Sequence, residues 1–326
     1  MSPYISYCMV FRHNGGSTCK SRKTKSRRKR NVTKNNNHCS PYSLKNKIVS
    51  GTCFTKEAIQ AMTDAHNKEN PSSSISRNLS PKEKWLRLRE RMSHCDQDNA
   101  CWLRSLPSKD KQFLQDQLFV PPKPTEWEKN PNSWLTNFDI AKVLNQYELA
   151  HPEFIFIGPS PIDYDTRKNK TECVCNRLCN FSVSKQLKLG KKKIGIVFNL
   201  DPHDKGGSHW VAMFIDLKDK FLFYFNSTGE EIQPQLLKFK DMVISQGIRD
   251  LGKMDYYVNT FEHQRSNTEC GMYCLYFIIT CLLREPDIFN TKKDKQNFNT
   301  QELVAYFTDK RIPDALVEGY RQELFY

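Results

Sequence analysis

The sequence predicts an α+β fold, in which a central mixed sheet packs against one buried helix, with a helical region and a basic tail in front of it. Two observations lead to this prediction. Strand-like runs follow one another between residues 154 and 226 without a regular alternation of strand and helix. The helical pattern at Cys270–Leu283 is apolar nearly all round, which is typical of a helix inside a core. A chain of 326 residues with 38% hydrophobic side chains is long enough for such a core.

Residues 1–54 are expected to form a disordered basic tail. The first 50 residues contain 12 of the 50 Lys and Arg and no acidic residue, although the net charge of the whole chain is only +14. Lys20–Lys34 holds nine basic residues in fifteen and almost nothing apolar. Such a segment could bind nucleic acid or another polyanion, act as a nuclear import signal, or remain a solvated tail. The sequence leaves these alternatives open.

Residues 55–124 are expected to form a helical accessory region with a linker. One helix is predicted to begin at Pro81, because Ser80 is a suitable N-cap and proline suits the first helical position. A second is predicted over Ser108–Leu118, with Phe113, Leu114 and Leu118 on its apolar face. The region ends at Pro121–Pro124, a stiff connector that cannot continue a helix.

Residues 125–326 are predicted to form the catalytic domain. The runs Val211–Ile215 and Phe221–Phe225, joined through Asp216–Lys220, suggest an antiparallel hairpin. We expect strands at Phe154–Ile157, Lys193–Leu200, His209–Leu217, Lys220–Asn226 and Tyr256–Phe261, and helices at Ala141–Leu149, Pro234–Gln246 and Cys270–Leu283.

Neither a membrane span nor an export signal is expected. No run approaches the roughly 20 apolar residues that a spanning helix needs. The short apolar run Tyr4–Phe11 has its positive charges after it, the reverse of a secretory signal. The 12 cysteines show no compact disulfide framework in their spacing, so we expect reduced thiols in cytosol-like surroundings.

Cys270 is the candidate nucleophile. It opens the apolar helix, where unpaired N–H groups and the positive end of the helix dipole favour an anion. These conditions are expected to lower the pKa of a thiol and make it reactive. Cys274 and Cys281, inside the helix, are better explained as small buried hydrophobes.

A cysteine nucleophile needs a base, and the base needs a partner that orients it. His209 follows the turn Gly206-Gly207-Ser208 and enters a predicted strand, and Asn226 ends the partner strand. The hairpin can therefore bring both side chains to one sheet edge, where Asn226 would accept the imidazole N–H. Cys-His-Asn is a workable form of the catalytic triad.

Gln264, six positions before Cys270, is the candidate oxyanion donor. Its side-chain N–H and the backbone N–H of Cys270 could stabilise a tetrahedral intermediate, where one donor is commonly worth about 3–4 kcal/mol. Taken one at a time, a histidine in a turn or a glutamine in a loop is usually structural. The joint arrangement of His209, Asn226, Gln264 and Cys270 is what favours catalysis.

This arrangement resembles the ubiquitin-like-protein protease superfamily of cysteine peptidases, which includes SUMO proteases and adenovirus protease. The resemblance is closer to the polyprotein-processing proteases of the African swine fever virus type, found in large DNA viruses. The resemblance runs from about residue 127 to 326 and rests on four segments, Trp134–Ile140, Ser208–Asp216, Tyr224–Gly229 and His263–Gly271. SUMO proteases usually have Asp where Asn226 stands, whereas the viral relatives have Asn.

The resemblance implies Cys270 as nucleophile, His209 as base, Asn226 as its orienter and Gln264 as oxyanion donor. It also implies a thiol endopeptidase that cleaves viral structural polyproteins after Gly-Gly during virion maturation, at assembly sites in the host cytoplasm and in the virion. No cofactor is required. Trp134 and Trp210 are candidate walls of a channel that admits only glycine, or else core tryptophans. Gly15-Gly16 could be a self-processing site, although adjacent glycines are common in tails.

Other functions remain open on the sequence. The same superfamily includes isopeptidases that remove ubiquitin-like modifiers, as well as acetyltransferases, and an inactive scaffold of the same fold is conceivable. The spacing of Cys173, Cys175 and Cys179 invites a metal site, but no nearby ligand completes the usual set of four. An insertion loop with exposed or half-buried thiols is the simpler interpretation.

Overall fold

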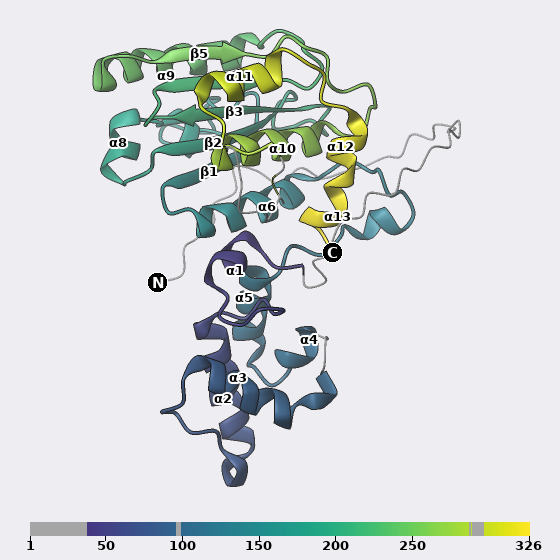
Figure 1. The fold of residues 1–326 in the computed structure, drawn as a ribbon. Helices are drawn as coiled ribbons and strands as arrows, with labels where there is room; N and C mark the ends of the chain where they lie inside the picture. Colours follow the sequence, from purple (N-terminus) through teal and green to yellow (C-terminus); the bar gives the residue numbers. More distant parts are fainter. Residues whose placement is uncertain (1–37, 96–98, 287, 289–296) are drawn as a thin grey trace. The chain divides into compact units, whose positions relative to one another are not determined.

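The computed structural model describes residues 38–95, 99–286, 288 and 297–326 (Figure 1). The chain divides into two compact units. Among the described residues, the sheet unit lies within Ile157–Ile312, and the helical unit comprises residues 38–156 and Pro313–Tyr326. The helical unit therefore takes in residues 125–156 and 313–326 as well as the region expected to be helical.

The sheet has five strands in the order β1-β2-β3-β4-β5. The strands β2, β3 and β4 pair antiparallel, whereas β4 and β5 pair parallel. The prediction of a mixed sheet in an α+β fold is thus confirmed. The bounds are β1 Phe154–Pro161, β2 Lys193–Asn199, β3 Trp210–Asp216, β4 Phe221–Phe225 and β5 Asp255–Val258.

The hairpin of β3 and β4 forms where the sequence predicts it. Ala212 lies opposite Phe225 at its open end, and Asp216 lies opposite Phe221 at the turn. The Asp216 carboxylate accepts the backbone N–H groups of Lys218 and Asp219, each at 3.0 Å, which closes the turn. The first residues of β3 and the last residues of β4 therefore lie at the same sheet edge.

Helices cover both faces of the sheet. Phe198 of β2 contacts Phe239 of α9, with ring centroids 6.0 Å apart. Phe223 and Phe225 of β4 point to the other face of the sheet. Their ring centroids lie 5.1 and 4.7 Å from that of Phe277 of α10. Every residue of β3 and β4 is buried, which explains why these strands are continuous apolar runs instead of alternating ones.

The remaining helices of the sheet unit frame this core. As predicted, α10 begins at Cys270 and ends at Leu283, and Arg284 after it adopts a left-handed conformation. Helix α9 extends beyond the predicted Gln246 to Leu251, where Gly252 ends it at φ 77°. The bounds are α7 Asn176–Cys179, α8 Val183–Lys188, α9 Pro234–Leu251, α10 Cys270–Leu283 and α11 Thr300–Thr308.

The helical unit has a core of its own. Trp85 packs between Phe54 and Trp102, with ring centroids 5.2 and 4.7 Å away. Helix α3 begins at Pro81 as predicted, with a capping box between Ser80 and Glu83. The bounds are α1 Pro41–Asn46, α2 Lys56–Glu69, η1 Pro71–Ser73, α3 Pro81–Arg91, η2 Ser93–Cys95, α4 Asn99–Trp102, α5 Ser108–Leu118, η3 Thr125–Glu128, α6 Asn137–Ala150, α12 Asp314–Gly319 and α13 Arg321–Leu324.

The prediction for the apolar face of α5 was partly wrong. The helix covers Ser108–Leu118 as expected, and Leu114 and Leu118 are buried. Phe113, however, is 61% exposed. Phe113 precedes Leu114 directly, so the two side chains project about 100° apart around the helix and only one can face the core.

The expectation of reduced cysteines was also wrong. The structure contains disulfides Cys39–Cys53, Cys95–Cys101 and Cys173–Cys179, and Cys175 is disulfide-bonded as well. Among the described cysteines only Cys270, Cys274 and Cys281 are free thiols. Connectivity could not be read from spacing, because the fold determines which sulfur atoms meet.

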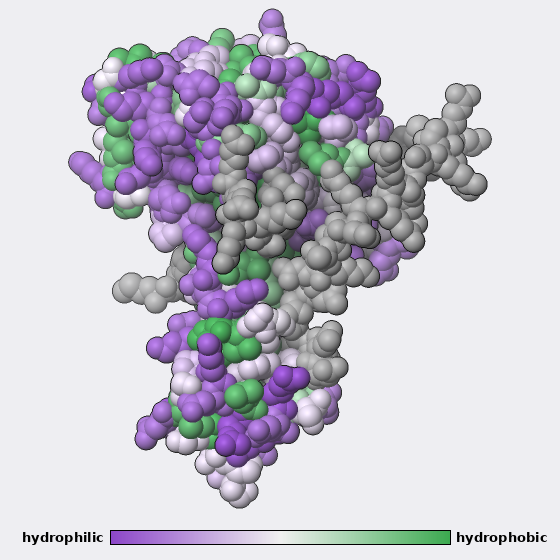
Figure 2. All heavy atoms as spheres, viewed as in Figure 1, coloured by the Kyte–Doolittle hydropathy of each residue, from purple (hydrophilic) through white to green (hydrophobic). Residues whose placement is uncertain are grey.

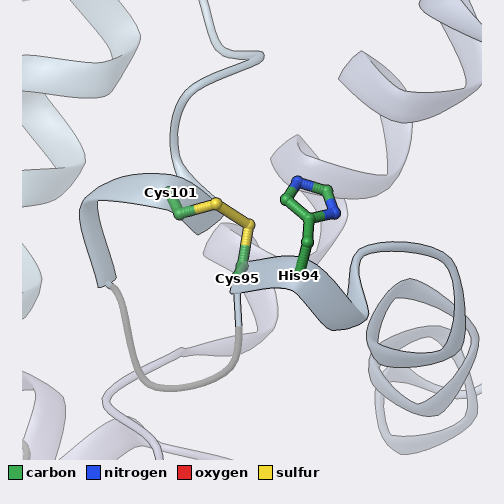
Figure 3. A group of neighbouring side chains, drawn as sticks. All are labelled: His94, Cys95 and Cys101. Carbon is green, nitrogen blue, oxygen red and sulfur yellow. A yellow bond between two sulfur atoms is a disulfide. The ribbon is translucent and has the colours of Figure 1, made fainter.

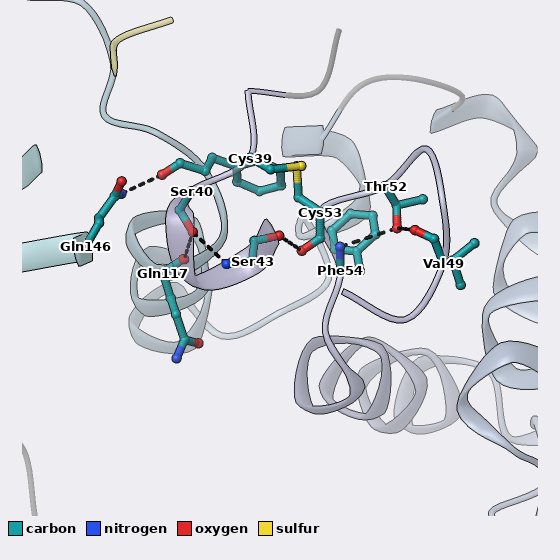
Figure 4. The surroundings of a disulfide bond; sticks show 10 residues. Cys39, Ser40, Ser43, Val49, Thr52, Cys53, Phe54, Gln117 and Gln146 are labelled. Atoms are coloured by element: carbon teal, nitrogen blue, oxygen red, sulfur yellow. Dashed lines mark hydrogen bonds between the residues drawn. A yellow bond between two sulfur atoms is a disulfide. The ribbon is translucent and has the colours of Figure 1, made fainter. Parts of the chain in front are cut away.

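Figure 4 shows how the Cys39–Cys53 disulfide is set into the helical unit. The Ser43 hydroxyl donates to the carbonyl of Cys53, and the Ser40 hydroxyl donates to the carbonyl of Gln117 (Figure 4). The side chain of Gln146 donates to the carbonyl of Phe119 at 2.7 Å. The start of the described chain is thereby joined to α5 and α6.

The described surface is mainly hydrophilic in the view of Figure 2, with small and separate hydrophobic patches. Within the described residues, no helix combines the length and the apolar character that crossing a bilayer requires. Lys20–Lys34 and Gly15-Gly16 lie outside the described residues, so the predictions for these two segments remain predictions. The expectation of a disordered tail up to residue 54 was wrong for Pro41–Asn46, which forms α1, capped by Ser40 and flanked by the Cys39–Cys53 disulfide.

Candidate active site

Cys270 lies in the first turn of α10, against the beginning of β3. It is 2% exposed. The backbone N–H groups of Trp210 and Gly271, together with its own, lie within hydrogen-bonding reach of its sulfur. Two parts of the chain 60 positions apart therefore meet at this thiol, and one of them is the residue that directly follows His209.

The expectation that the helix start lowers the pKa of Cys270 was wrong. Burial raises the pKa of this thiol to about 11, and the neighbouring Glu269 carboxylate acts in the same direction. The N–H groups around the sulfur oppose this shift but do not overcome it. Removal from water thus outweighs the helix terminus, and the resting form at neutral pH is the thiol.

His209 and Asn226 form a direct pair. His209 Nε2 lies 2.8 Å from Asn226 Oδ1. The hairpin of β3 and β4 accounts for this contact, because His209 directly precedes β3 and Asn226 directly follows β4. The structure thus brings together two of the residues that the sequence singles out.

The neighbours of Asn226 settle which atoms face His209. The Thr228 backbone N–H and hydroxyl both donate to Asn226 Oδ1, at 3.1 and 2.9 Å. Since that atom accepts hydrogen bonds, His209 Nε2 must carry the proton in the neutral ring. The lone pair is then on Nδ1, the nitrogen able to take a proton from a thiol.

Burial also lowers the pKa of His209, against the opposing effects of the Asn226 hydrogen bond and the Glu230 carboxylate. Neutral imidazole is therefore the resting form at neutral pH, opposite a neutral thiol. With a neutral thiol at Cys270 and a neutral ring at His209, the resting form of the two residues is not a thiolate–imidazolium pair.

The turn that the sequence predicts directly before His209 depends on a glycine. Gly207 has φ 90°, and a Cβ there would lie 2.8 Å from Nδ2 of Asn199. The backbone carbonyl of His209 accepts the N–H of Leu200 at 2.9 Å. Glycine is thus required at position 207 to return the chain to the sheet at His209.

Gln264 is held at both ends of its amide group. Its Oε1 accepts a 2.7 Å hydrogen bond from the Ser227 hydroxyl, and its Nε2 donates to the carbonyl of Ser266 at 2.6 Å. Its backbone N–H donates to the Ser227 carbonyl at 2.8 Å. An amide nitrogen carries two protons, so a second N–H of fixed orientation is available for a ligand.

His263, next to Gln264, is structural. It is fully buried, its Nδ1 accepts the backbone N–H of Ile312 at 3.0 Å, and its Nε2 lies 2.9 Å from the carbonyl of Phe307. Both ring nitrogens are thereby used within the core. Burial lowers the pKa of His263, in keeping with a neutral ring.

The two tryptophans named as channel walls differ in their surroundings. Trp210 begins β3 in the sheet unit and is 5% exposed. Trp134 belongs to the helical unit and is 37% exposed. Their role in substrate binding remains a prediction.

Neither of two cysteine groups offers free thiolates to a metal ion. Cys173 and Cys179 are bonded to each other and Cys175 is also in a disulfide, so these sulfur atoms are not available as thiolate ligands. Both Cys173 and Cys175 are buried, contrary to the expected exposed or half-buried thiols. His94, Cys95 and Cys101 bring ligand atoms within 4.8 Å of one another, but the two sulfur atoms again form a disulfide (Figure 3).

Sequence reasoning missed three residues around the candidate site. Ser227 and Thr228 directly follow Asn226 and contact the amides of Gln264 and Asn226. Asn259 contacts the backbone of Asn226 from the end of β5. Ser227 and Thr228 could have been suspected from their position beside Asn226, whereas Asn259 lay inside a predicted strand and gave no signal.

The pair of His209 and Asn226, and the Cys270 thiol at the backbone of Trp210, lie on an α+β sheet, and comparison with known proteins assigns such a domain to the class of cysteine peptidases. Residues 182–308, which contain all four candidate residues, match the Ulp1 protease family, C-terminal catalytic domain. The chain carries a Ulp1-like cysteine peptidase domain, related to cysteine proteases of large DNA viruses.

Two viral relatives illustrate this similarity. The Putative thiol protease of Acanthamoeba polyphaga mimivirus is 28% identical over 279 residues, which cover 79% of this chain and 89% of the relative. The SUMO-1 cysteine protease of African swine fever virus is 27% identical over 210 residues, which cover 60% of this chain and 69% of the relative.

Solved structures agree on the fold. A crystal structure of the African swine fever virus protease superposes with a TM-score of 0.52 at 22% identity, covering 77% of this chain and 93% of that one. A selenomethionine form of the same protease gives a TM-score of 0.53 at 20% identity, covering 88% and 97%.

Proposed function

We propose that this cysteine peptidase is an endopeptidase that cleaves viral structural polyproteins after Gly-Gly during virion maturation. The observation that carries the proposal is the 2.8 Å contact between His209 and Asn226, next to a thiol whose sulfur meets the backbone of Trp210. In this proposal Cys270 is the nucleophile, His209 the base, Asn226 its orienter and Gln264 the oxyanion donor.

The reaction begins with transfer of the Cys270 proton to Nδ1 of His209. The sulfur attacks the carbonyl carbon of the scissile peptide, and the oxyanion accepts hydrogen bonds from Gln264 Nε2 and the backbone N–H of Cys270. Collapse of the tetrahedral intermediate releases the amine, which takes the proton from His209. Water, deprotonated by His209, then attacks the acyl-enzyme, the carboxylic acid product is released, and His209 returns the proton to the departing Cys270 sulfur.

Specificity for Gly-Gly has a simple steric basis. A narrow channel walled by aromatic side chains admits only residues without side chains, and the backbone N–H of Trp210 lies within hydrogen-bonding reach of the Cys270 sulfur. Trp134 belongs to the helical unit, and its predicted role as a wall rests on the sequence alone. The substrate must reach a thiol that is 2% exposed, which also favours a slender peptide.

The remaining parts of the chain are proposed to serve the same task. The helical unit would act as an accessory region for substrate, and the segment Lys20–Lys34 would contact nucleic acid or another polyanion. The place of action is the viral assembly site in the host cytoplasm, and the virion. The same proposal includes self-processing after Gly16.

The test is digestion of candidate virion precursors with the purified full chain, followed by mass mapping of the new termini. New carboxyl termini ending in Gly-Gly, absent with Cys270→Ala, are the expected result. Cleavage at other sequences, or identical cleavage by Cys270→Ala, would contradict the proposal.

A second candidate function is removal of a ubiquitin-like modifier. It is favoured by one observation, the name SUMO-1 cysteine protease carried by the relatives from African swine fever virus. Assaying a SUMO-conjugated protein beside a Gly-Gly-X peptide separates the two functions. Faster turnover of the conjugate would assign the chain to the isopeptidases.

A further inference from the structure

Asn259 binds the backbone of Asn226 through both ends of its amide group. The Asn226 backbone N–H donates to Asn259 Oδ1 at 2.8 Å, and Asn259 Nδ2 donates to the Asn226 carbonyl at 2.9 Å. The second Nδ2 proton goes to the Phe261 carbonyl at 3.1 Å. Both residues are 0% exposed. Asn259 thus uses its amide entirely on backbone groups, mainly those of the proposed orienter.

The Asn259 side chain binds the Asn226 backbone at the end of the sheet, where no strand within the described residues pairs with it. The last pair of the parallel strands β4 and β5 is Tyr224 with Val258. Asn259 directly follows β5. Its side chain offers a hydrogen-bond acceptor and a donor to Asn226, where a neighbouring strand would offer the N–H and carbonyl of its backbone. Asn226, which lies just beyond β4, therefore has both its backbone N–H and its carbonyl hydrogen-bonded, as a residue within the sheet would.

The surrounding backbone leaves little freedom. Gly229 packs so closely against the chain after Asn259 that an added Cβ would lie 2.8 Å from the Thr260 carbonyl oxygen. The segment Asn226–Gly229 is thus enclosed between β4 and residues 259–262. Any shift of Asn226 would have to move this packed backbone with it.

We propose that Asn259 is a positioning residue that fixes Asn226, and through it the tautomer and orientation of His209. The inference rests on the proposed triad and extends it by one layer. Asn259 holds the backbone of Asn226, Thr228 holds its Oδ1, and that oxygen holds Nε2 of His209. Nδ1 of His209 is thereby kept ready to receive the proton of Cys270.

The chemistry of the contact requires an amide. Aspartate at position 259 keeps the acceptor for the Asn226 N–H, but it places oxygen atoms against the carbonyls of Asn226 and Phe261. Serine keeps polarity and is too short to reach both groups. Asn259→Asp and Asn259→Ser should therefore misplace Asn226 by different routes, and the serine variant serves if the aspartate variant does not fold.

The control is Gln246→Glu, which makes the same chemical change elsewhere in the sheet unit. Gln246 also joins a backbone N–H and a carbonyl through its amide, accepting from Val183 at 2.8 Å and donating to Phe181 at 3.3 Å. Its side-chain hydrogen bonds go to Val183 and Phe181, and not to His209, Asn226 or Cys270. The loss of thermal stability in Gln246→Glu measures how much an amide with a purely structural role contributes to the stability of the fold.

The experiment measures kcat and KM on a Gly-Gly-X peptide for the full chain, alone and combined with Asn226→Ala. We expect Asn259→Asp to lower kcat about tenfold or more with KM within about twofold of wild type. In the Asn226→Ala background the same change should lower kcat by less than about twofold, because the group that it positions is gone. Gln246→Glu should leave kcat unchanged.

A second readout needs no substrate. The rate at which iodoacetamide alkylates Cys270 at neutral pH, followed by mass mapping and with Cys270→Ala as the blank, reports proton transfer to His209. It should fall in both Asn259 variants and stay at the wild-type value in Gln246→Glu. If wild type cleaves no Gly-Gly peptide, the proposed specificity fails while alkylation still tests positioning. Equal losses in the presence and absence of Asn226, or wild-type alkylation in both folded Asn259 variants, would overturn the inference.

Discussion

The Ser227 hydroxyl donates a 2.7 Å hydrogen bond to Oε1 of Gln264 and thereby decides which way the Gln264 amide faces. With Oε1 occupied, Nε2 points the other way, where it already binds the Ser266 carbonyl. Ser227 directly follows Asn226 in the chain, and Thr228, the next residue, holds Oδ1 of Asn226. Ser227 and Thr228 therefore orient Gln264, the proposed oxyanion donor, and Asn226, the proposed partner of the base.

Ser227→Ala should impair catalysis more than binding. Without the hydroxyl, the amide of Gln264 can rotate and present its oxygen to a developing oxyanion. Because loss of one oxyanion donor costs about 10²–10³ in kcat, a misoriented donor should cost about tenfold or more, with KM nearly unchanged. Steady-state kinetics on a Gly-Gly-X peptide measure this.

The matched control for Ser227→Ala is Ser43→Ala. Ser43 is also a buried serine whose hydroxyl binds a carbonyl, but it lies in the helical unit. It should cost about 1–3 kcal/mol of stability, as expected when a buried hydrogen-bond partner is removed, and leave kcat unchanged. Equal kinetic effects of the two substitutions would show that Ser227 does not act through Gln264.

The reactivity of Cys270 should depend on pH through His209. The pKa of the thiol is about 11, so without a base its alkylation by iodoacetamide should rise steadily from pH 7 to pH 10. His209→Ala should show this behaviour. In wild type, alkylation at neutral pH should be faster, and it should decline as the pH falls below about 6.5, because the lowered pKa of His209 keeps the base neutral down to that range. Identical profiles for the two proteins would remove His209 from the mechanism.

The three proposed triad residues should differ in the size of their effects on peptide cleavage. Cys270→Ala and His209→Ala should abolish turnover above background while the fold persists. Asn226→Ala should cost less, since the thiol and imidazole remain and only the tautomer and orientation of the ring are lost. Kinetics with circular dichroism as a folding check test this order. An equal loss for Asn226→Ala and His209→Ala would give the orienter a larger role.

His263 should make the fold sensitive to acid. Its pKa is lowered in the folded state, and its Nδ1 accepts the Ile312 N–H only when it is unprotonated. The unfolded chain therefore binds more protons below pH 6.5, so the free energy of unfolding falls as the pH falls through that value. Each such group can contribute at most about 1.4 kcal/mol per pH unit. His209 and His38, whose pKa values are also lowered, act in the same direction.

Thermal unfolding between pH 5.5 and 7.5 measures this effect. His263→Gln should lower stability at pH 7.5 and flatten its dependence on pH. His203→Gln is a suitable comparison, because His203 already pairs with the Asp163 carboxylate at 2.6 Å and lies outside the core. An unchanged slope in His263→Gln would show that His263 is not the group responsible.

Much of the fold could be predicted because its elements have strong local signals. Helix α10 is apolar on all sides and has the predicted bounds Cys270–Leu283, and the short loop after Asp216 identifies the hairpin. Helix α9 was predicted too short, since nothing in the pattern at Gln246 distinguishes its end from its middle. Its stop is Gly252, six residues later.

Features that depend on distant contacts could not be predicted. The meeting of Asn259 with Asn226 follows from the parallel pairing of β5 with β4, which no local pattern encodes. The raised pKa of Cys270 follows from burial by the whole fold, whereas the sequence shows only the helix start that opposes it. Disulfide pairing likewise depends on which loops the fold brings together.

The Cys39–Cys53 disulfide should stabilise the helical unit more than Cys95–Cys101. The first closes a loop with a sequence separation of 14 and the second one of only 6. On the chain-entropy model these loops correspond to about 3 and about 2 kcal/mol of stability, respectively. Both bonds lie in the core around Trp85 and Trp102, so removing either should lower the melting temperature of the full chain without altering Cys270.

Thermal unfolding of Cys39→Ser/Cys53→Ser and Cys95→Ser/Cys101→Ser, each measured with and without reductant, tests this. Reductant should destabilise each double variant only through the disulfides that it retains. A wild-type melting temperature that does not respond to complete reduction, verified by mass spectrometry, would show that the bonds add nothing to the stability of this unit.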